Sequence, residues 1–385
     1  MLVLTNELPP YRVPLFAQLG KLTRLFRVYL SCDPRNVAAV GRQSCLGFDI
    51  FFLKAVFVRK EWLHPGGFRD HGVVHFPIDT YQRLKQERPD VVISGELGLR
   101  SMMAWLYCRS MGRDNCRLIL WATVSERTEI SRGCLRLCLR RFLLRRADAV
   151  VTNGQSGLRY VTRLGASASS VFTVPYVADP LFFRAARPCH SVYCRKRLLY
   201  VGQLSERKGL KQFIAVLQEW ASRNIEREIE FVIAGNGPLD AWLRRLRLPR
   251  NLRLELLGYV PYSALPDVYG SCGIFVFPTL ADEWGVAVNE AMAASLPVLG
   301  SVYSQAVEEL VRDGVNGWVF RPDDPAGMRC CLERVMNTPA ANLARMGALA
   351  RESVARLTPE WAARQMWRVI EHVCKARLAG TQPLS

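Results

Sequence analysis

The 385-residue sequence contains no run of about 18 apolar residues, the length that a membrane-spanning helix requires. Its start, MLVLTNELPP, lacks the basic segment and apolar core of a secretory signal peptide. It also lacks CxxC pairs, internal repeats of solenoid period and low-complexity tracts. We therefore expect a folded cytoplasmic protein of two domains whose 12 cysteines are reduced thiols.

Histidine is scarce, with five residues in the chain. None is spaced as in a catalytic triad or a metal site, and we expect His75 and His372 in packed or surface positions. Cys189, His190 and Cys194 lie close together, but no second pair of ligands follows at zinc-finger spacing. The sequence therefore predicts no structural metal site.

Acidic residues are scarce in the first half. Residues 1–200 hold 31 lysines and arginines against 14 acids, whereas residues 201–385 hold 21 against 20. The formal net charge of +18 thus resides almost entirely in the first half. Such a one-sided field favours an anionic partner, which could be a membrane surface, nucleic acid or a phosphorylated substrate. A basic surface that only confers solubility would give the same composition.

Short apolar runs alternate with helix-like segments along both halves. Runs such as 90–94 (DVVIS) and 231–234 (FVIA) are typical of strands buried on both faces of a parallel sheet. The other expected strands are 1–5, 118–122, 149–152, 198–201, 254–257, 274–277 and 297–300. This pattern predicts an α/β protein with two blocks, each built like a Rossmann fold.

Composition changes between the two blocks. The segment 174–196 carries several prolines, only one acid and no clear hydrophobic period, as linkers do. We expect a first domain over 1–178, a linker over 179–196 and a second domain over 197–357. Thr358-Pro359-Glu360 has the pattern of a helix start, so a final helix and tail should occupy 358–385.

A basic loop follows the expected strand at 198–201. In LYVGQLSERKGL the strand ends at Gly202, and Arg207 and Lys208 precede a helix. Ligands of open α/β sheets bind at the carboxyl ends of strands, and a lysine beside a helix N-terminus is well placed for a phosphate. A solvated basic turn is the alternative. The glycine-rich turn in FVIAGNGP is weaker support, because a plain strand-to-helix turn has the same composition.

The segment FVFPTLADEWGVAVNEAMAASLP places two acids, Asp282 and Glu290, eight positions apart around a helix start. The free N–H groups of a first helical turn can bind an anion. The carboxylates can accept charge-assisted hydrogen bonds from sugar hydroxyls. The alternative is that Asp282 and Glu283 only complement the helix dipole, which would leave Glu290 as an unexplained carboxylate among alanine and methionine.

This segment resembles the family 4 glycosyltransferases of the GT-B fold. In that family an acid, seven residues and a glutamate precede an Ala-Met pair, as Asp282 and Glu290 precede Ala291-Met292 here. Four further segments fit in the right order: 201–209 (VGQLSERKG), 233–238 (IAGNGP), 257–260 (LGYV) and 308–320 (EELVRDGVNGWVF). The first half matches more loosely, through 6–15, 89–95 and 145–154. The resemblance implies two Rossmann-like domains facing an interdomain cleft, with the last helix crossing back to the first domain.

The resemblance also implies a UDP- or GDP-linked sugar donor, bound mainly by the second domain. Lys208 would hold the diphosphate and stabilise its developing charge, Glu290 would bind the ribose, and Asp282 would contact the transferred sugar. The donor-side residues that we expect are Gln203, Arg207, Lys208, Tyr259, Val260, Asp282, Glu283, Trp284, Gly285, Val286 and Glu290.

Two positions depart from the family pattern. Gln203 stands where arginine is frequent, so Arg207 would have to supply the missing positive charge. Asp282 stands where glutamate is usual, and Glu283 could substitute for it. Pro9-Pro10-Tyr11-Arg12 also replaces a glycine-rich turn that many members carry, and Arg12 could reach the donor phosphates from there.

The resemblance implies a hexosyltransferase that retains the anomeric configuration. The acceptor would be a glycan or a lipid-linked molecule, in bacterial cell-surface polysaccharide or glycolipid synthesis. The chain contains no DxD pair, with which GT-A enzymes hold a metal ion, so we expect no cofactor. The alternatives are an epimerase or phosphorylase on the same fold and a non-catalytic protein that binds sugar nucleotides or nucleic acid. For nucleic acid, no helix-turn-helix, zinc finger or RNP pattern is present.

In the first domain, Glu96 follows the strand at 90–94 and is our candidate for orienting the acceptor or contacting the reacting centre. An ordinary loop acid is the alternative. Glu126 and Glu129 are similar but weaker candidates.

Residues 131–146 (SRGCLRLCLRRFLLRR) contain six arginines and no acid. On a helix, Leu135, Cys138, Leu139 and Phe142 share one face, and Arg132, Arg136 and Arg140 lie on another. A basic amphipathic helix can lie on an anionic bilayer, so we expect the protein to be peripheral on the cytoplasmic membrane face. The alternative is a helix that packs on the core with a solvated basic face.

Overall fold

The computed structural model describes residues 1–32, 47–112, 115–130, 133–184 and 197–379. The chain divides into two compact units. The first unit contains Met1–Trp62, His71–Val177 and Pro359–Ser385, and the second contains Leu63–Asp70 and Ala178–Thr358.

The first unit is built on a parallel sheet. Within the described residues it has seven strands in the order β3-β2-β1-β6-β7-β8-β9, and every neighbouring pair is parallel. Its strands are β1 (Leu2–Thr5), β2 (Arg27–Leu30), β3 (Asp49–Phe52), β6 (Val91–Gly95), β7 (Arg117–Ala122), β8 (Ala149–Thr152) and β9 (Val171–Thr173). The strands β1 and β8 are buried along their whole length, and β6 and β7 at all but one residue each, as the continuous apolar runs predict.

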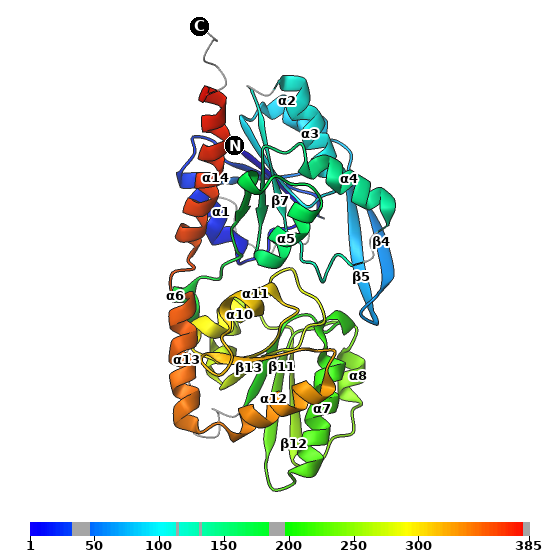
Figure 1. Ribbon diagram of the computed structural model, residues 1–385, viewed down its shortest axis with the longest axis vertical. Helices are drawn as coiled ribbons and strands as arrows, with labels where there is room; N and C mark the ends of the chain where they lie inside the picture. Colours follow the sequence, from blue (N-terminus) through cyan, green and yellow to red (C-terminus); the bar gives the residue numbers. More distant parts are fainter. Residues whose placement is uncertain (33–46, 113–114, 131–132, 185–196, 380–385) are drawn as a thin grey trace. The chain divides into compact units, whose positions relative to one another are not determined.

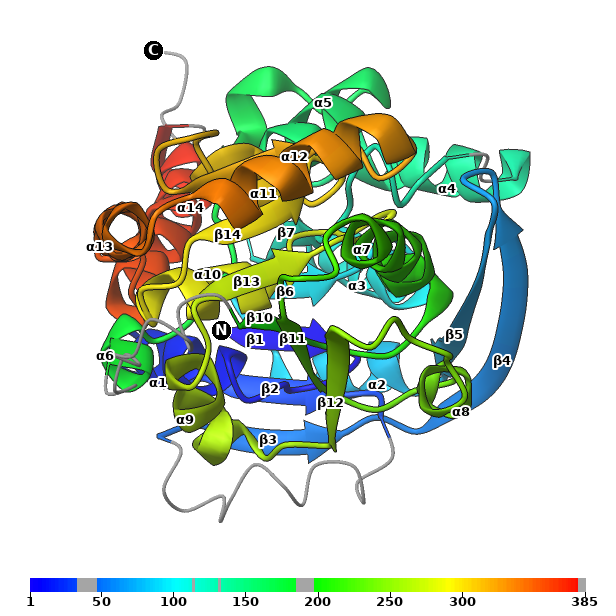
Figure 2. The same ribbon diagram turned by 90° about the horizontal axis from the view of Figure 1, so that it is seen from below.

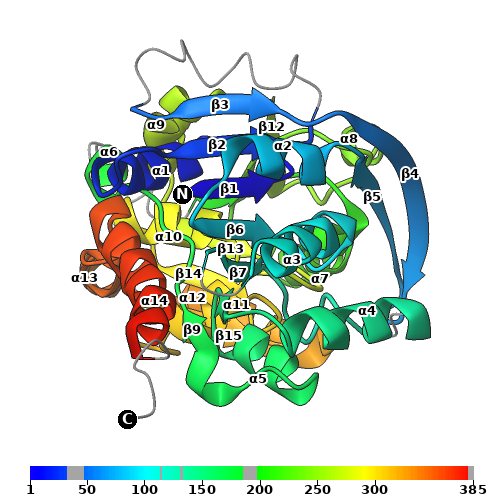
Figure 3. The same ribbon diagram turned by 90° about the horizontal axis from the view of Figure 1, so that it is seen from above.

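Helices cover both faces of this sheet. They are α1 (Arg12–Lys21), α2 (Thr80–Glu87), α3 (Leu99–Met111), α4 (Cys134–Leu144), α5 (Gln155–Arg163) and α14 (Pro359–Ala379). Figures 1 and 3 show α1 and α14 side by side on one face, and α2 and α3 together on the other. Right-handed crossovers require this, because the chain leaves β1 and β6 in opposite directions along the sheet.

A long hairpin, β4 (Ala55–His64) and β5 (Phe68–Pro77), forms a separate two-stranded sheet. Its tip, Leu63–Asp70, groups with the second unit. The sequence reading did not anticipate this hairpin.

The second unit has a six-stranded parallel sheet within the described residues, in the order β12-β11-β10-β13-β14-β15. Its strands are β10 (Leu198–Val201), β11 (Ile229–Ala234), β12 (Leu252–Gly258), β13 (Ile274–Phe277), β14 (Val298–Ser301) and β15 (Gly317–Phe320). Its helices are α6 (Pro180–Arg184), α7 (Leu210–Arg223), α8 (Asp240–Arg244), α9 (Leu265–Gly270), α10 (Val286–Ala293), α11 (Gln305–Leu310), α12 (Pro325–Asn337) and α13 (Ala340–Val354). In Figure 2, α7 and α12 lie together on one face, where Phe213, Trp220 and Leu332 join the core.

The α/β class with two parallel, Rossmann-like sheets is confirmed, and the last helix groups with the first unit. The expected linker needs correction at its start: α6 forms there and packs against α10 of the second unit, because Phe183 is fully buried. Residues 185–196, with Cys189, His190 and Cys194, lie outside the described residues, as does the tail from 380. Within the described part of the chain, no helix is long and apolar enough to cross a membrane.

Candidate functional site

The strand order reverses once in each sheet, and open α/β proteins bind ligands at such points. In the second unit the reversal lies between β10 and β13. Lys208 follows β10 and Asp282 follows β13, so both lie at the carboxyl ends of the strands that flank the reversal.

Gly209 explains how the two loops meet. It has φ +70°, and a Cβ there would lie 2.0 Å from the carbonyl oxygen of Pro278, so only glycine fits. The Leu280 amide donates to the Arg207 carbonyl at 2.8 Å, which ties the loop after β13 to the loop after β10. The glycine after Lys208 is therefore required for the basic loop to reach Asp282.

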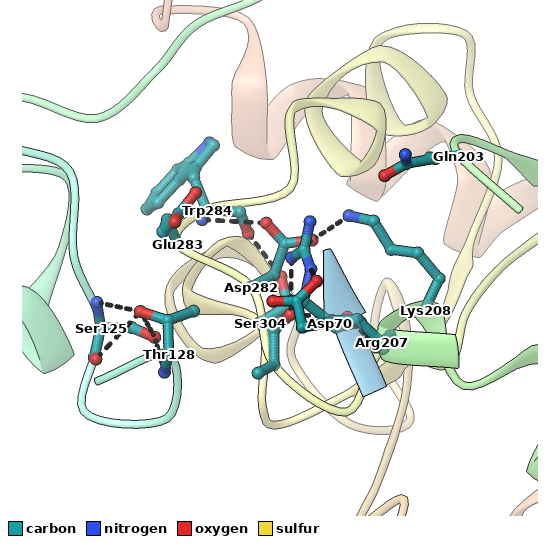
Figure 4. A network of polar contacts seen from close by, with 12 residues as sticks. Asp70, Ser125, Thr128, Gln203, Arg207, Lys208, Asp282, Glu283, Trp284 and Ser304 are labelled. Carbon is teal, nitrogen blue, oxygen red and sulfur yellow. Dashed lines mark hydrogen bonds and ion pairs between the residues drawn. The ribbon is translucent and has the colours of Figure 1, made fainter. Parts of the chain in front are cut away.

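A compact charged cluster results, and Figure 4 shows it. The Lys208 ammonium contacts Asp282 Oδ2, and Arg207 Nη1 lies 3.8 Å from the same oxygen. Arg207 also donates to the Ala281 carbonyl at 2.9 Å. From the hairpin tip, Asp70 Oδ1 lies 3.6 Å from Arg207 Nε. Two cations are thus held beside two carboxylates.

Burial and mutual attraction shift the pKa values of this cluster. Burial alone would raise the pKa of Asp282, but Lys208 and Arg207 hold it below the ordinary value. Burial lowers the pKa of Lys208, and Asp282 opposes that shift. Burial also acts to lower the pKa of Arg207, but Asp282, Glu283 and Asp70 raise it above the ordinary value. The cluster therefore contains ionised groups that are shielded from water, where their fields are strong.

The loop that carries Asp282 is fixed from the next strand. The Asp282 amide donates to the Tyr303 carbonyl at 3.1 Å, and Ser304 Oγ donates to the Trp284 carbonyl. The Trp284 indole is buried and donates to Asn289 Oδ1 at 2.8 Å. Gly285, with φ +102°, begins α10, whose first N–H groups have no partner within the helix. Anions bind well to such a helix start.

Glu290 lies inside α10 and is 6% exposed. Its Oε2 accepts a hydrogen bond from the Tyr269 hydroxyl at 2.8 Å. Burial raises the pKa of Glu290 to about 7, although the Tyr269 hydrogen bond acts in the opposite direction. Tyr262, whose pKa is also raised by burial and by Glu290, stacks on Phe182 with ring centroids 5.3 Å apart.

The remaining donor-side residues lie around the cluster, and of these Glu283 acts on it through its charge. The side chains of Gln203, Tyr259 and Glu283 are exposed, and Val260 is half-buried. In Figure 4 the Gln203 side chain lies apart from the contacts between Lys208 and Asp282. The second unit thus brings Arg207, Lys208, Asp282 and the start of α10 together, and leaves Gln203 unengaged.

The first unit has its own reversal, between β1 and β6. Asn6 follows β1 and Glu96 follows β6. Asn6 Nδ2 donates to Glu96 Oε2 at 3.0 Å, and Arg100 Nη2 lies 3.1 Å from Glu96 Oε1. Arg100, which is 1% exposed, also donates to Asn6 Oδ1 and Ser31 Oγ. These contacts hold the partly exposed Glu96 carboxylate in one position.

The Glu96 backbone adopts φ +66°, the left-handed region that favours glycine. A non-glycine residue there costs about 1–3 kcal/mol, and such residues concentrate at functional sites. The Glu96 carbonyl accepts from Ser101 Oγ at 2.5 Å, which helps to hold the strained conformation.

Several expectations for the first unit need correction. Arg140 is not on a solvated face: it is 3% exposed, pairs with Glu129 and donates to the Tyr160 hydroxyl at 2.6 Å. Glu129 is therefore one partner of a buried ion pair. Glu126 forms ion pairs with two arginines of α5.

The exposure of side chains along α4 differs from our prediction, and its two ends differ from each other. Leu135, expected on the packed face, is 86% exposed, and Cys138 is also exposed. Arg136 is exposed, and Arg132 lies outside the described residues. The N-terminal part of α4 thus presents both apolar and basic side chains to solvent, whereas its C-terminal part packs on the core.

Arg12 is held inside the first unit. Its guanidinium lies 5.1 Å from the Trp121 ring centroid and 4.7 Å from that of Tyr176, and it donates to Thr5 Oγ1 and to the Tyr176 hydroxyl. In the turn after β7, the Ser125 and Thr128 side chains bond each other (Figure 4). These contacts leave Arg12 a packing role at the carboxyl edge of the first sheet.

Sequence reasoning missed Asp70, Tyr269, Asn6 and Arg100. Each acts on a residue that was predicted but has no motif of its own, and Asp70, Tyr269 and Asn6 do so from a separate segment of the chain. For Asn6 and Arg100, the position after a strand that flanks a sheet reversal was the available signal. Among the described residues, no group of three His, Cys, Asp or Glu side chains is arranged to hold a metal ion.

Comparison with known proteins shows a similarity that is strongest in the second unit. Residues 195–338 match the family model described as glycosyl transferases group 1. The chain is 28% identical over 182 residues to alpha-D-kanosaminyltransferase of Streptomyces kanamyceticus, covering 45% of this chain and 46% of that protein. It is 26% identical over 302 residues to 2-deoxystreptamine N-acetyl-D-glucosaminyltransferase of Streptomyces fradiae, covering 74% and 70%. The chain spans about half the length of the first curated relatives it matches.

Solved structures match almost the whole chain. An Anabaena protein, HepE, solved with UDP and glucose, has a TM-score of 0.72 at 14% identity and covers 96% of this chain and 99% of its own. An Escherichia coli protein bound with UDP-2-fluoro glucose has a TM-score of 0.67 at 13% identity, covering 97% and 98%. At such low identity the likeness is one of fold. The chain thus has the GT-B fold, and its residues 195–338 are similar to the glycosyl transferases group 1.

Proposed function

We propose that the protein is a glycosyltransferase that moves a hexose from a nucleotide-sugar donor to a hydroxyl-bearing acceptor. The observation that carries this proposal is the cluster of Lys208, Arg207 and Asp282 beside the start of α10. It lies at the strand-order reversal of a unit whose sequence matches glycosyl transferases group 1. Solved proteins of the same fold hold UDP and glucose, so UDP is our first donor nucleotide.

The chemistry needs positive charge where the diphosphate leaves. As the bond between the sugar and the diphosphate breaks, negative charge develops on the leaving oxygen. Lys208 and Arg207 are positioned for this charge by Gly209 and by the loop contacts, and the helix start at Gly285 adds N–H donors. Because the cations are fixed before the donor arrives, little reorganisation is needed during the reaction. We propose that these groups act without a metal ion.

Glu290 is proposed to accept hydrogen bonds from the ribose hydroxyls, and Asp282 to contact the sugar. An ionised carboxylate is the stronger acceptor, so Glu290 should bind ribose best above its pKa of about 7. The diphosphate would attract Lys208 away from Asp282 Oδ2, which would free that oxygen for a sugar hydroxyl.

Glu96 is proposed to orient the acceptor. Its carboxylate is partly exposed but held by Asn6 and Arg100, and its strained backbone argues for a role beyond packing. A fixed carboxylate can accept a hydrogen bond from the acceptor hydroxyl and align it for attack.

The test is a panel of nucleotide sugars incubated with the purified protein and candidate glycan or lipid-linked acceptors. We expect release of nucleoside diphosphate that depends on the acceptor, and unchanged turnover when EDTA is present. NMR of the product should show the anomeric configuration of the donor, as a retaining transfer requires. A new donor epimer without diphosphate release would identify an epimerase instead. Binding of UDP without turnover on any acceptor would favour a binding protein.

The acceptor side is proposed to face an anionic membrane surface, as expected for enzymes of cell-surface polysaccharide or glycolipid synthesis. The first unit supports this through exposed apolar side chains next to basic ones. Leu135 adjoins Arg136 on α4, and Phe57 and Val58 adjoin Arg59 on the hairpin. Vesicle flotation with and without anionic lipid tests the proposal. Recovery that does not depend on the anionic lipid would contradict it.

A further inference from the structure

The first unit contains a cavity that the proposed reaction does not use. Its volume is about 380 Å³, and it lies where the end of α3, the end of α4 and the start of β7 meet. Glu96 follows the carboxyl end of β6, whereas this cavity adjoins the amino ends of β7 and β8. We call it the dithiol pocket, because Cys108 and Cys116 are among its lining residues.

The two sulfur atoms of the dithiol pocket lie 3.2 Å apart. A disulfide bond has a length of about 2 Å, so a movement of roughly 1 Å would bring the sulfurs to bonding distance. Both cysteines are largely buried, yet both belong to the residues that line the cavity. The other cysteine pair on this unit, Cys134 and Cys138, is exposed on α4 and has no recorded contact between its sulfurs.

The walls of the dithiol pocket are basic. Arg109 and Arg146 line it, and Arg146 is further fixed over the Phe142 ring, 4.0 Å from the centroid. The acid in the wall, Asp148, pairs with Arg117 at 3.0 Å and accepts from the Leu118 amide at 2.8 Å. The charge of Asp148 is therefore satisfied within the fold, and the two arginines determine the field that an entering molecule meets.

We propose that Cys108 and Cys116 form a redox-active dithiol that reacts with an anionic low-molecular-weight disulfide. A Cys116 thiolate attacks one sulfur of the small disulfide, which forms a mixed disulfide and releases one small thiol. Cys108 then loses its proton and attacks the Cys116 sulfur, which forms the Cys108–Cys116 bond and releases the second small thiol. The protein dithiol is oxidised and the small disulfide is reduced to two thiols, so atoms and electrons balance.

The order of attack follows from the contact between the sulfurs. The hydrogen bond to Cys116 and burial raise the pKa of Cys108, so Cys108 keeps its proton longer. Cys116 is then the first nucleophile and Cys108 the resolving thiol. Cys108 lies near the end of α3, and Cys116 directly precedes β7. The disulfide bond would therefore join the end of this helix to the start of this strand.

The experiment uses the reduced full-length protein and oxidised glutathione, whose carboxylates suit the two arginines. After reaction, remaining thiols are alkylated under denaturing conditions and the digest is analysed by mass spectrometry. We expect peptides joined through Cys108 and Cys116, lighter by two hydrogen atoms than the two reduced peptides. The protein with the bond should show a higher Tm by a few degrees, because the link reduces the entropy of the unfolded chain. Recovery of both cysteines in alkylated form, while Cys134 and Cys138 react, would overturn the proposal.

A variant with Cys134→Ser and Cys138→Ser is the matched control and should form the same bond at the same rate. A Cys108→Ser variant should stop at the mixed disulfide between Cys116 and glutathione. A disulfide between Cys116 and any other cysteine in the wild-type protein would contradict the proposed pair.

The role of the basic walls has its own test. Arg109→Gln with Arg146→Gln should slow reaction with oxidised glutathione several-fold, but not reaction with the uncharged disulfide of 2-mercaptoethanol. Equal slowing with both reagents would contradict a role for the arginine charges. None of these readouts depends on glycosyl transfer.

Discussion

The two units place charged side chains at the same topological position but hold them differently. In the second unit, Lys208 and Asp282 come from loops after β10 and β13 and meet in a buried cluster of opposite charges. In the first unit, Glu96 follows β6 and is held by one buried guanidinium, one amide and a strained backbone. One site is organised around fixed positive charge, and the other around a fixed, partly exposed carboxylate.

This difference separates two tasks of a transfer reaction. A diphosphate brings negative charge, which a preformed pair of cations can stabilise. A neutral acceptor hydroxyl needs alignment and a hydrogen-bond acceptor, which a carboxylate supplies. Variants that affect one task and spare the other therefore test the comparison.

The largest expected effect is that of Lys208→Ala. Loss of the ammonium should lower kcat/KM by about 10²–10³-fold and weaken UDP binding, because we propose that this cation stabilises the leaving diphosphate. Steady-state kinetics and calorimetric titration with UDP measure both effects. Lys208→Arg, which keeps the charge, should recover part of the binding. UDP affinity equal to that of the wild type would remove Lys208 from the donor site.

Glu290→Gln should have opposite effects on stability and binding. The pKa of Glu290 is about 7 in the folded protein against an ordinary value of 4.5, so the folded state binds the extra proton between these values. Stability therefore falls as pH rises through this window, by about 3 kcal/mol in total. The variant should lack this loss and melt higher than the wild type above pH 7, with the difference vanishing below pH 4.5.

The same variant should bind UDP about 10-fold more weakly, because a neutral amide is a poorer acceptor for ribose hydroxyls. Wild-type affinity for UDP should rise with pH through about 7, and that of the variant should not. A parallel pH dependence in the two proteins would show that Glu290 does not contact the nucleotide.

Glu96→Gln should lower kcat by about 10–100-fold at saturating acceptor while UDP affinity stays unchanged. The matched control is Glu126→Gln, another acid that follows a strand of the same sheet but pairs with surface arginines. The control should keep full activity. Loss of UDP affinity in Glu96→Gln would contradict the separation of tasks between the two units.

The smallest effect should come from Asp70→Asn. Asp70 lies 3.6 Å from Arg207 and competes with a diphosphate for its charge. We expect about threefold tighter UDP binding, a gain of several tenths of a kcal/mol, because the pair is only partly exposed and its attraction is modest. Glu61→Gln removes a charge from the same hairpin at a residue paired with His71 and should leave affinity unchanged.

The donor-side residues that we propose were identified from the sequence because they lie in short segments of fixed spacing. Asp282 and Glu290 share one loop and one helix, and Lys208 precedes a glycine that its loop requires. Gln203 shows the limit of this reasoning: the family pattern placed it at the diphosphate, but its side chain is exposed and apart from the cluster. For Arg140, helical periodicity predicted a solvated face, and the buried Glu129 carboxylate determined its orientation instead.

The sequence by itself determined the parallel sheets and the motifs on which the proposed chemistry of the second unit rests, because apolar runs, turn residues and motif spacing are local properties of the chain. Only the tertiary structure decided which distant groups complete each site. Tyr269 reaches Glu290, Asp70 reaches Arg207, and Arg100 fixes Glu96 together with Asn6. Such pairs form because crossovers and packing bring separate segments together. The separation of two residues along the chain does not predict how far apart their side chains lie in the folded protein.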